Sequence, residues 1–519
     1  MLRAGITSDN KIFIITDDLS VKSLLEFKHK ETKYNPFIKQ WRTEEVTDKI
    51  YSTRKKKDGY WYFELGLGWA AYIINTFYKF LLADDCRQIQ GAIFSDSYRT
   101  IPFAGLRDIQ NEDILHILKY RIGLFSVYTG YGKTQVISTL AEYALSMGKK
   151  VLILAPSIKE MEEFVKRIKK LFGIEIKKRR KLDKICSADE QIRCIVTAGV
   201  MNAGKYKDAS LLAQEQQELA SYEWVLADEV EYVMSPGGKF ILDMCTGATN
   251  LYGFSGTADK SSGEMISFSE GLNRSVIENK DLVTYFGPSL VYRLPLHLNI
   301  DLITVKTSAL DNIKFEEDDF KQDSNVYMNV MNRMWTDDGV CQVITQLAEY
   351  YPKLFIPINN LNEIISTWID NYWLGKFRVL LVAGEGYIYY DLEGNRTKLT
   401  LQEACDKIGA NEVDIIPSTS SGYRALDFPG LENILLVQGN IAGVVLQCIG
   451  RIRGNHMNII SLDSLKGKKI PVHTKGLDQR RDMILEYYKY SKVNEITILE
   501  SEIGKPQDEV NPGNPWFTL

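Results

Sequence analysis

The sequence lacks features that mark several classes of protein. Its seven cysteines are scattered and include no C-x-x-C pair, which argues against a zinc site or a disulfide framework and for reduced thiols. Its longest apolar runs, such as residues 151–156, have the length of a strand and are too short to span a bilayer. The first residues lead into polar sequence without the apolar core of a signal peptide. We therefore expect a cytoplasmic protein with no membrane partner.

An excess of positive charge is also absent. The chain has 63 Lys and Arg against 67 Asp and Glu, which gives a net charge of −4. A protein that binds nucleic acid through its overall charge would be basic. Any surface for DNA or RNA must therefore be local. The length of 519 residues predicts three or four domains.

Apolar strands alternate with helical segments in two stretches of the chain. In the first stretch, strands are expected at residues 123–128, 150–155, 193–197, 224–227 and 251–254. In the second stretch, they are expected at residues 353–358, 378–382, 413–417 and 433–437. Apolar strands separated by helices predict parallel sheets that are covered on both faces. The predicted fold class is α/β, with two such domains in tandem.

The remaining segments complete the predicted domain organisation. Residues 1–98 are a small α+β accessory domain, with a helix at residues 21–29 and a basic run at residues 54–57 that precedes Tyr60-Trp61-Tyr62. The first parallel-sheet domain is expected at 99–300 and the second at 326–480. An acidic linker is expected at 301–325, and a helix with a tail at 481–519.

A phosphate-binding loop is the first chemical motif. Thr129-Gly130-Tyr131-Gly132-Lys133-Thr134 lies between an apolar strand and a helix, which is the context that such a loop requires. The glycines let backbone N–H groups face phosphate oxygens. Lys133 would meet the β- and γ-phosphates of ATP, and Thr134 would bind Mg²⁺. The loop departs from the general pattern because Val127 stands where a first glycine is usual.

A pair of carboxylates follows another apolar strand. Asp228 and Glu229 come directly after residues 224–227, so the strand delivers both to an edge of the sheet. Asp228 would hold Mg²⁺, and Glu229 would orient and deprotonate the attacking water. A solvated acidic turn is the rival interpretation, and the position about 95 residues after a phosphate loop disfavours it.

Further motifs stand in the order that an ATP-driven motor requires. Leu106-Arg107-Asp108-Ile109-Gln110 precedes the loop, and Gln110 could read the adenine edge with its amide. Ser255 and Thr257 follow a strand and could couple the ATP site to nucleic acid. In the second half, Gln447-Cys448-Ile449-Gly450-Arg451-Ile452-Arg453 offers arginines that could neutralise charge on the γ-phosphate.

Contacts with nucleic acid should come mainly from hydroxyls and backbone at the ends of strands. The candidates are Pro156, Ser157, Thr197, Thr419 and Ser420. Residues 166–184 hold ten Lys or Arg, which could grip a phosphate backbone or form a solvated basic face.

Together these motifs resemble those of the superfamily 2 helicases over about residues 100–480. Within that superfamily, the L-R-x-x-Q form at residues 106–110 and Gly253-Phe254-Ser255-Gly256-Thr257 are most similar to the phage UvsW-type, RecG-like DNA helicases. The resemblance implies two RecA-like domains, ATP and Mg²⁺ as cofactors, and a duplex-binding N-terminal module. It also implies that Arg107, Gln110, residues 129–134 and Asp427 bind nucleotide.

The implied function is an ATP-dependent DNA helicase that moves 3′ to 5′ along DNA as a monomer during replication, recombination or repair, in the host cytoplasm if the protein is phage-encoded. Single-stranded, duplex or branched DNA would be its partner. Two alternatives remain: an RNA helicase or transcript-release factor, and an ATP-switched clamp with little turnover. The clamp is suggested by Glu231, where the family has histidine or aspartate, and by Gly454, where it has arginine. Ala425 also replaces a usual glycine, and either Arg451 or Arg453 could contact the γ-phosphate.

Overall fold

The computed structural model describes residues 2–35, 40–96, 98–128, 130–174, 176, 191–197, 200, 208–256, 266–269, 271–295, 298–316, 319, 324–358, 362–383, 386–419, 430–437, 449, 456–470 and 473–505. The chain forms two compact units, Met1–Arg293 and Leu294–Leu519. Each unit contains a largely parallel sheet with helices, and the first also carries a small N-terminal module. The predicted α/β fold class is therefore confirmed, while the domain boundaries stay predictions.

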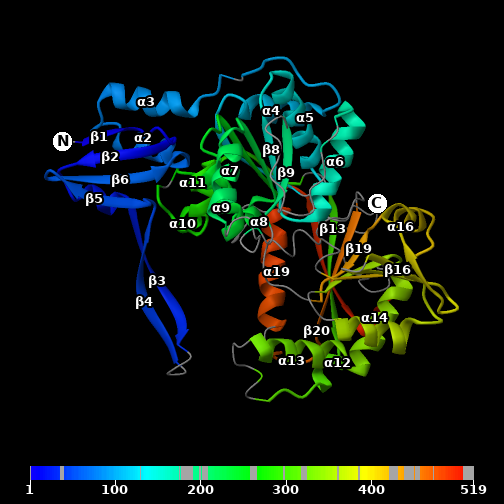
Figure 1. Cartoon of the computed structure of the whole chain (residues 1–519). Helices are drawn as coiled ribbons and strands as arrows, with labels where there is room; N and C mark the ends of the chain where they lie inside the picture. Colours follow the sequence, from blue (N-terminus) through cyan, green and yellow to red (C-terminus); the bar gives the residue numbers. More distant parts are fainter. Residues whose placement is uncertain are drawn as a thin grey trace. The chain divides into compact units, whose positions relative to one another are not determined.

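The N-terminal module is built on an antiparallel sheet of strand order β1-β2-β6-β5. Its elements are β1 (Leu2–Ile6), β2 (Lys11–Thr16), α1 (Val21–Leu24), β3 (Glu26–Asn35), β4 (Gln40–Lys49), β5 (Thr53–Lys57), β6 (Tyr60–Gly66), α2 (Ala70–Phe77) and α3 (Ala83–Ile93). Ile12, Ile14, Phe63 and Leu65 alternate along β2 and β6 and are buried, as a sheet with one covered face requires. Strands β3 and β4 form a separate hairpin that extends away from this sheet (Figure 1).

The helix predicted at residues 21–29 is wrong in its second half. The helix ends at Leu24, and Glu26 begins β3. Phe27 and His29 alternate with lysines, a period of two that suits a strand, and β3 pairs with β4 along its whole length. The long-range pairing therefore overrides the short helical signal.

The first parallel sheet has the strand order β12-β7-β11-β10-β8-β9, and every neighbouring pair is parallel. Its strands are β7 (Ile122–Val127), β8 (Val151–Ala155), β9 (Ile192–Val196), β10 (Trp224–Asp228), β11 (Asn250–Ser255) and β12 (Ser289–Arg293). The helices are α4 (Asp108–Ile117), α5 (Lys133–Ser146), α6 (Ile158–Phe172), α7 (Ala209–Ala220), α8 (Val230–Val233), α9 (Pro236–Met244), α10 (Arg274–Glu278) and α11 (Lys280–Phe286). Helices α4, α5 and α6 pack on one face, while α8, α9 and α11 lie on the other (Figure 1).

The N-terminal module shares a hydrophobic core with this second face. Trp69 is fully buried, and its indole N–H donates to Thr284 Oγ1 at 3.0 Å. Gly68 lies so close to α11 that a β-carbon there would be 1.7 Å from the carbonyl oxygen of Val283. The accessory module is therefore part of the first unit's packing and is not held on a free tether.

The second unit contains a nine-stranded sheet of order β17-β16-β15-β18-β14-β19-β20-β13-β21. Its strands are β13 (Asn299–Thr307), β14 (Leu354–Ile358), β15 (Val379–Ala383), β16 (Gly386–Tyr390), β17 (Arg396–Leu399), β18 (Ile415–Thr419), β19 (Asn433–Leu435), β20 (His456–Ser464) and β21 (Lys492–Leu499). Its helices are α12 (Ala309–Asn312), α13 (Ser324–Trp335), α14 (Asp338–Tyr350), α15 (Asn362–Trp368), α16 (Leu401–Gly409) and α19 (His473–Tyr487). In the described part of this sheet, β16 is antiparallel to both of its neighbours, β15 and β17, and the other neighbouring pairs are parallel.

Two predicted segments at the ends of this unit differ from the structure. Residues 301–307, assigned to the acidic linker, lie in β13, which pairs with both β20 and β21. The segment 481–519, predicted to be a helix and a tail, also contributes β21 to the sheet. Apolar residues such as Ile303 and Val305 are buried there, so core packing decides the structure before the acidic residues begin.

Within the ranges given above, no helix combines the length and the apolar composition needed to cross a bilayer. The cysteines of those ranges, Cys86, Cys194, Cys245, Cys341 and Cys405, are free thiols.

The close approach of Gly68 to α11 predicts a specific loss of stability. Gly68→Ala should lower the free energy of unfolding by about 1–3 kcal/mol, because the added methyl group forces backbone apart in a packed core. Gly91→Ala in α3 is the control, since a β-carbon there meets nothing within 4 Å. Thermal unfolding of the two variants measures the difference, and an unchanged Gly68→Ala midpoint would contradict the docking described here.

Candidate active site

The candidate site lies along one edge of the first parallel sheet. In parallel strands the carboxyl ends share an edge, so segments distant in sequence meet there. The phosphate loop follows β7, Ser255 ends β11, and Asp228 ends β10. Strand β11 lies between β7 and β10 in the sheet. The strand order therefore brings the loop, the hydroxyl and the carboxylates together.

The described part of the phosphate loop has the backbone that phosphate binding requires. Gly130 and Gly132 have φ angles of +98° and +93°, which residues with side chains rarely adopt. Helix α5 begins directly afterwards at Lys133, with Gly132 as its N-cap. Free N–H groups at a helix start favour an anion. Thr129, the first residue of the motif, lies outside the described residues.

Lys133 is paired with Glu229 at the centre of the site. Its Nζ lies 3.0 Å from Glu229 Oε1, and both side chains are largely buried. Burial by itself would lower the pKa of Lys133, but the charges of Glu229, Asp228 and Glu231 outweigh burial and raise the pKa. The amine is therefore held as a cation next to the loop, where a phosphate could replace Glu229 as its partner.

Asp228 has the properties of a magnesium ligand. Burial, and then the neighbouring charge of Glu229, raise the pKa of this carboxyl well above its usual range. Its Oδ1 atom is buried and has no hydrogen-bond partner among the described residues. Mg²⁺ in nucleotide sites uses one or two protein oxygens together with phosphates. Asp228 and the hydroxyl of Thr134 therefore fit this ion, and Asp228 Oδ1 is an oxygen that could bind it.

Glu229 and Glu231 are held by different means. Glu229 has φ +45° and ψ +60°, a left-handed conformation that is strained for a residue with a side chain. Glu231 accepts a hydrogen bond from Ser255 Oγ at 2.6 Å. Burial and the charge of Glu229 raise the pKa of Glu231 to about 7. The coupling residue proposed on β11 thus contacts the residue that departs from the usual motif.

Gln110 and Arg107 contact the loop itself. The Gln110 amide donates to the Tyr131 carbonyl at 2.8 Å and accepts from the Arg107 N–H at 2.9 Å. The Arg107 guanidinium donates to the same carbonyl. Gln110 is 3% exposed, so reading adenine would require it to exchange these partners.

Residues 107–266 match the DEAD/DEAH box helicase family model. This segment is therefore similar to the helicase domains of that family. The resemblance inferred from the motifs is therefore confirmed at the level of the superfamily. No curated protein matches the whole sequence significantly.

Solved structures give distant similarities. UvsW of phage T4 is 14% identical, with 96% of this chain and 99% of that chain covered, at a TM-score of 0.36. Dbp5 of Saccharomyces cerevisiae bound to RNA and ADP-BeF3 is 13% identical over 76% of this chain and 90% of that chain, at a TM-score of 0.48. The helicase Lhr of Mycobacterium smegmatis bound to single-stranded DNA and AMP-PNP is 14% identical over 76% and 49%, at a TM-score of 0.42.

The proposed nucleic-acid contacts of the helicase domain lie on the same sheet edge. Pro156 and Ser157 follow β8 and are half-buried, and the Ser157 hydroxyl donates to Glu160. Thr197 follows β9 but is only 2% exposed, so its side chain is not accessible to nucleic acid. Thr419 in the second unit is 8% exposed. The other predicted residues, Thr257, Ser420, Asp427, Gln447, Arg451 and Arg453, lie outside the described residues.

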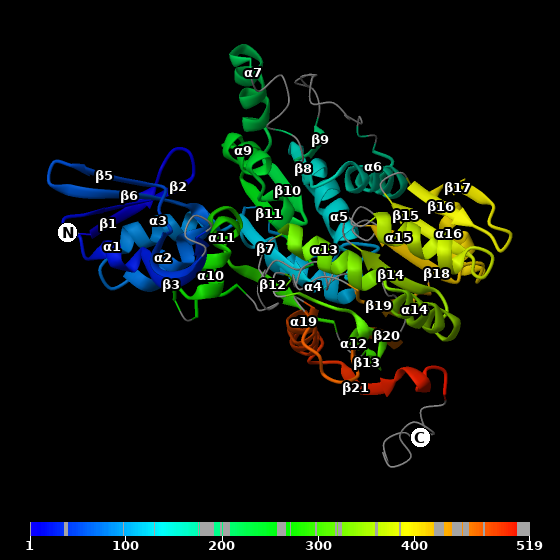
Figure 2. The same ribbon diagram turned by 90° about the horizontal axis from the view of Figure 1, so that it is seen from below.

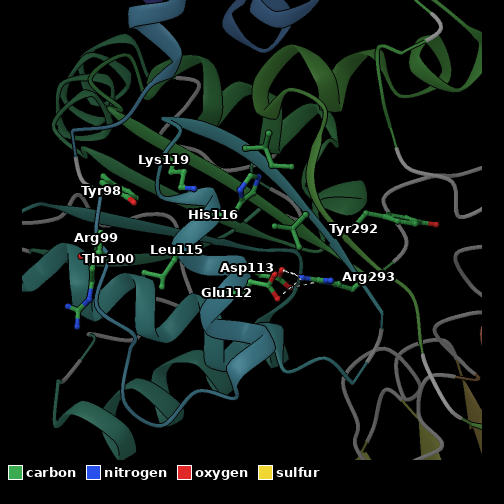
Figure 3. Close-up of a pocket in the computed structure, with 12 residues that line it drawn as sticks. Tyr98, Arg99, Thr100, Glu112, Asp113, Leu115, His116, Lys119, Tyr292 and Arg293 are labelled. Atoms are coloured by element: carbon green, nitrogen blue, oxygen red, sulfur yellow. Dashed lines mark hydrogen bonds and ion pairs between the residues drawn. The ribbon is translucent and has the colours of Figure 1, made fainter.

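Sequence reasoning missed two residues behind the phosphate loop. Asp113 accepts a hydrogen bond from the Tyr131 hydroxyl at 2.7 Å, and Arg293 contacts Asp113 from β12. A cavity of about 580 Å³ lies beside this pair (Figure 3). Its lining includes residues of α4, residues of β12 and residues 98–100. The position of Tyr131 between two loop glycines is the feature of the sequence that indicates such partners, because a large aromatic side chain with a hydroxyl usually packs against other residues and donates a hydrogen bond.

The raised pKa of Glu231 predicts a pH effect on stability. A carboxyl that binds its proton more tightly in the folded state makes unfolding easier as the pH rises from about 4.5 to about 7. Glu231→Gln removes this ionisation, so the variant should gain stability over the unmodified protein across that window. Glu45→Gln, at an exposed carboxylate of the same unit, is the control. Unfolding midpoints at pH 5 and pH 7.5 measure the effect, and a difference that does not change with pH would refute the assignment.

Proposed function

We propose that this protein is an ATP-dependent DNA helicase or translocase that remodels branched DNA during replication, recombination or repair, moving 3′ to 5′. The observation that carries the ATPase part is the buried group of Lys133, Asp228 and Glu229 beside the glycine loop. The preference for DNA is supported by the L-R-x-x-Q form at residues 106–110 and by Gly253-Phe254-Ser255-Gly256-Thr257. We further propose that the protein acts as a monomer.

The residues of the first unit divide the chemistry among them. Lys133 and the loop N–H groups would bind the β- and γ-phosphates. Mg²⁺ would supply positive charge that offsets the negative charge of the phosphates. Asp228 and Thr134 would hold it. Glu229, freed from Lys133 by the phosphates, would orient water and accept its proton.

The second half of the chain would complete the site. Arg451 or Arg453 would stabilise the charge on the γ-phosphate, with Gln447 and Asp427 also near the nucleotide. An arginine supplied by a second domain makes hydrolysis depend on domain closure. Ser255 would transmit the change, since its hydroxyl already contacts Glu231 next to the catalytic carboxylates. Pro156, Ser157, Thr419 and Ser420 remain the proposed contacts to the track, together with the backbone of Thr197.

A clamp that binds ATP but hardly hydrolyses it is the second candidate. Its support is Glu231, a third carboxylate, half-buried, beside Asp228 and Glu229. Excess negative charge could keep the attacking water and the phosphates from their closest approach. The ATPase rate separates the clamp from the motor, and the choice of nucleic acid separates a DNA enzyme from an RNA helicase or transcript-release factor.

The decisive measurement is the steady-state ATPase rate with matched single-stranded DNA, duplex DNA, four-way junction and RNA. We expect DNA to stimulate hydrolysis, with branched DNA the most effective. Lys133→Ala and Glu229→Gln should each lower the stimulated rate by about 100-fold or more, because they remove charge stabilisation and the general base. Chelating Mg²⁺ should abolish hydrolysis.

Each other result selects another function. Stimulation by RNA alone would show an RNA enzyme. Hydrolysis absent with every nucleic acid, with ATP still bound, would leave the clamp. Nucleic-acid binding retained in Glu229→Gln confirms that this variant is folded and impaired only in chemistry.

We also propose that the N-terminal module contacts nucleic-acid phosphates through β5. Residues 54–57 are all exposed on this edge strand. The guanidinium of Arg54 and the amine of Lys56 lie over the Trp61 ring, at 5.3 Å and 5.4 Å from its centroid. Cations held against a ring lose less freedom when they bind phosphate. Lysines also protect edge strands from aggregation, so charge alone does not decide the role.

The salt dependence of binding tests this contact. Lys56→Gln should weaken DNA binding and reduce the slope of log affinity against log salt by about 0.7–0.9, the value for one lost phosphate contact. Lys79→Gln is a close control, because Lys79 is an exposed lysine of the same unit that also lies over a ring, that of Tyr78. Equal slopes for the two variants would show that β5 serves only to protect the edge.

A further inference from the structure

Tyr131 is an unusual residue within the phosphate loop, because its side chain is fully buried. Its hydroxyl donates to Asp113 Oδ2 at 2.7 Å, and its ring contacts those of Phe125 and Tyr128. Burial and the Asp113 carboxylate raise the pKa of Tyr131, so the hydroxyl stays protonated and remains a donor. The hydrogen bond from Tyr131 therefore fixes the position of the loop relative to Asp113 on α4.

Asp113 is in turn held by Arg293. Arg293 Nη2 lies 2.6 Å from Asp113 Oδ1, and Nε lies 3.1 Å from each carboxylate oxygen. The side chains point toward one another beside the cavity (Figure 3). The hydrogen bond and charge of Asp113 raise the pKa of Arg293. This two-pronged contact is the strong geometry for a guanidinium and a carboxylate.

Arg293 also joins the phosphate loop through its backbone. Its carbonyl accepts the N–H of Tyr128, just before the loop, at 3.0 Å. Arg293 is the last residue of β12 and of the first unit, and Leu294 begins the second. The chain that leaves the first unit is therefore attached to the loop by both its main chain and its side chain.

The cavity distinguishes a movable contact from a fixed one. Asp113 is almost fully buried, with 4% of its side chain exposed, while 34% of the Arg293 side chain is exposed. The cavity of about 580 Å³ lies beside Arg293 and also exposes Glu112, whose carboxylate is 3.2 Å from Nη2. Arg293 can therefore leave Asp113 for Glu112 or solvent without repacking a core.

We propose that Tyr131, Asp113 and Arg293 form a positioning relay that makes the phosphate loop sensitive to the start of the second unit. The relay deepens the proposed function and rests on it, because it transmits the effect of nucleic acid on ATP binding. These residues act on the loop and do not touch the reacting atoms. Tyr131 fixes the position of the loop. The contact of Arg293 with Asp113 depends on the position of the chain that leaves the first unit.

The test measures how nucleic acid changes the affinity for ATP. Tyr131→Phe removes only the hydroxyl, and Arg293→Gln removes the charge from Asp113. Each should reduce the ratio of ATP affinity with and without DNA by about five-fold or more, the usual lower bound for coupled sites. The double variant should lose no more than either single one, because both break the same chain of contacts.

Matched controls separate the relay from general damage. Tyr128→Phe changes a neighbouring tyrosine whose ring packs on Tyr131, and Arg121→Gln changes an arginine that donates to the Thr249 carbonyl. Both should keep the coupling ratio. If Arg293→Gln does not fold, Arg293→Lys keeps the charge without the two-pronged contact and should lose part of the coupling.

Several outcomes would overturn the relay. An unchanged ratio in Tyr131→Phe, or losses that multiply in the double variant, would show that the contacts are only structural. If DNA does not affect ATP binding in the unmodified protein, the proposed function fails first. The relay is then judged by the Michaelis constant for ATP alone, and independent effects of the two substitutions on that constant would refute it.

Discussion

The structure around the candidate site depends on one buried ion pair, Lys133 with Glu229. Two further carboxylates, Asp228 and Glu231, share its surroundings, so one ammonium faces three acids. Buried charge is costly unless it is paired. The raised pKa values of Asp228 and Glu231 are the direct result of this imbalance. A divalent cation would reduce the repulsion among the carboxylates, and phosphates could replace Glu229 as the partner of Lys133. The charges that are costly to bury together are therefore the ones that favour a cation and phosphates as ligands.

Such a site needs a rigid support, and the sheet supplies it. Strands β8 and β10 are buried along their whole length, and helices cover both faces. The strained backbone of Glu229 follows β10, and the left-handed glycines of the loop follow β7 in the same sheet. Local strain persists where the surrounding structure leaves no alternative. The N-terminal module adds to this support, because it shares a core with the face of the sheet opposite α4, α5 and α6.

The part of this structure that could be predicted from the sequence is the part that depends on short chemical motifs. A glycine loop between strand and helix, and carboxylates after an apolar strand, are local patterns, and Lys133, Asp228 and Glu229 indeed come together. Strand order is not local, so the contact of Ser255 with Glu231 could not be derived. The same limit explains the errors. Residues 26–29 form a strand because β4 pairs with them, and residues 301–307 do so because β20 and β21 flank them.

The phosphate loop is constrained from two sides, and the alternation of its residues makes this possible. Gly132 separates Tyr131, which turns into the core toward Asp113, from Lys133, which meets Glu229 at the sheet edge. A β-carbon at Gly132 would lie 2.7 Å from the Gln110 amide nitrogen, so glycine also lets Gln110 reach the Tyr131 carbonyl. Nucleotide would act on the Lys133 side, and in the proposed relay the end of the first unit would act on the Tyr131 side. Tyr131 and Lys133 are separated only by Gly132, so a displacement of one residue would shift the backbone that positions the other.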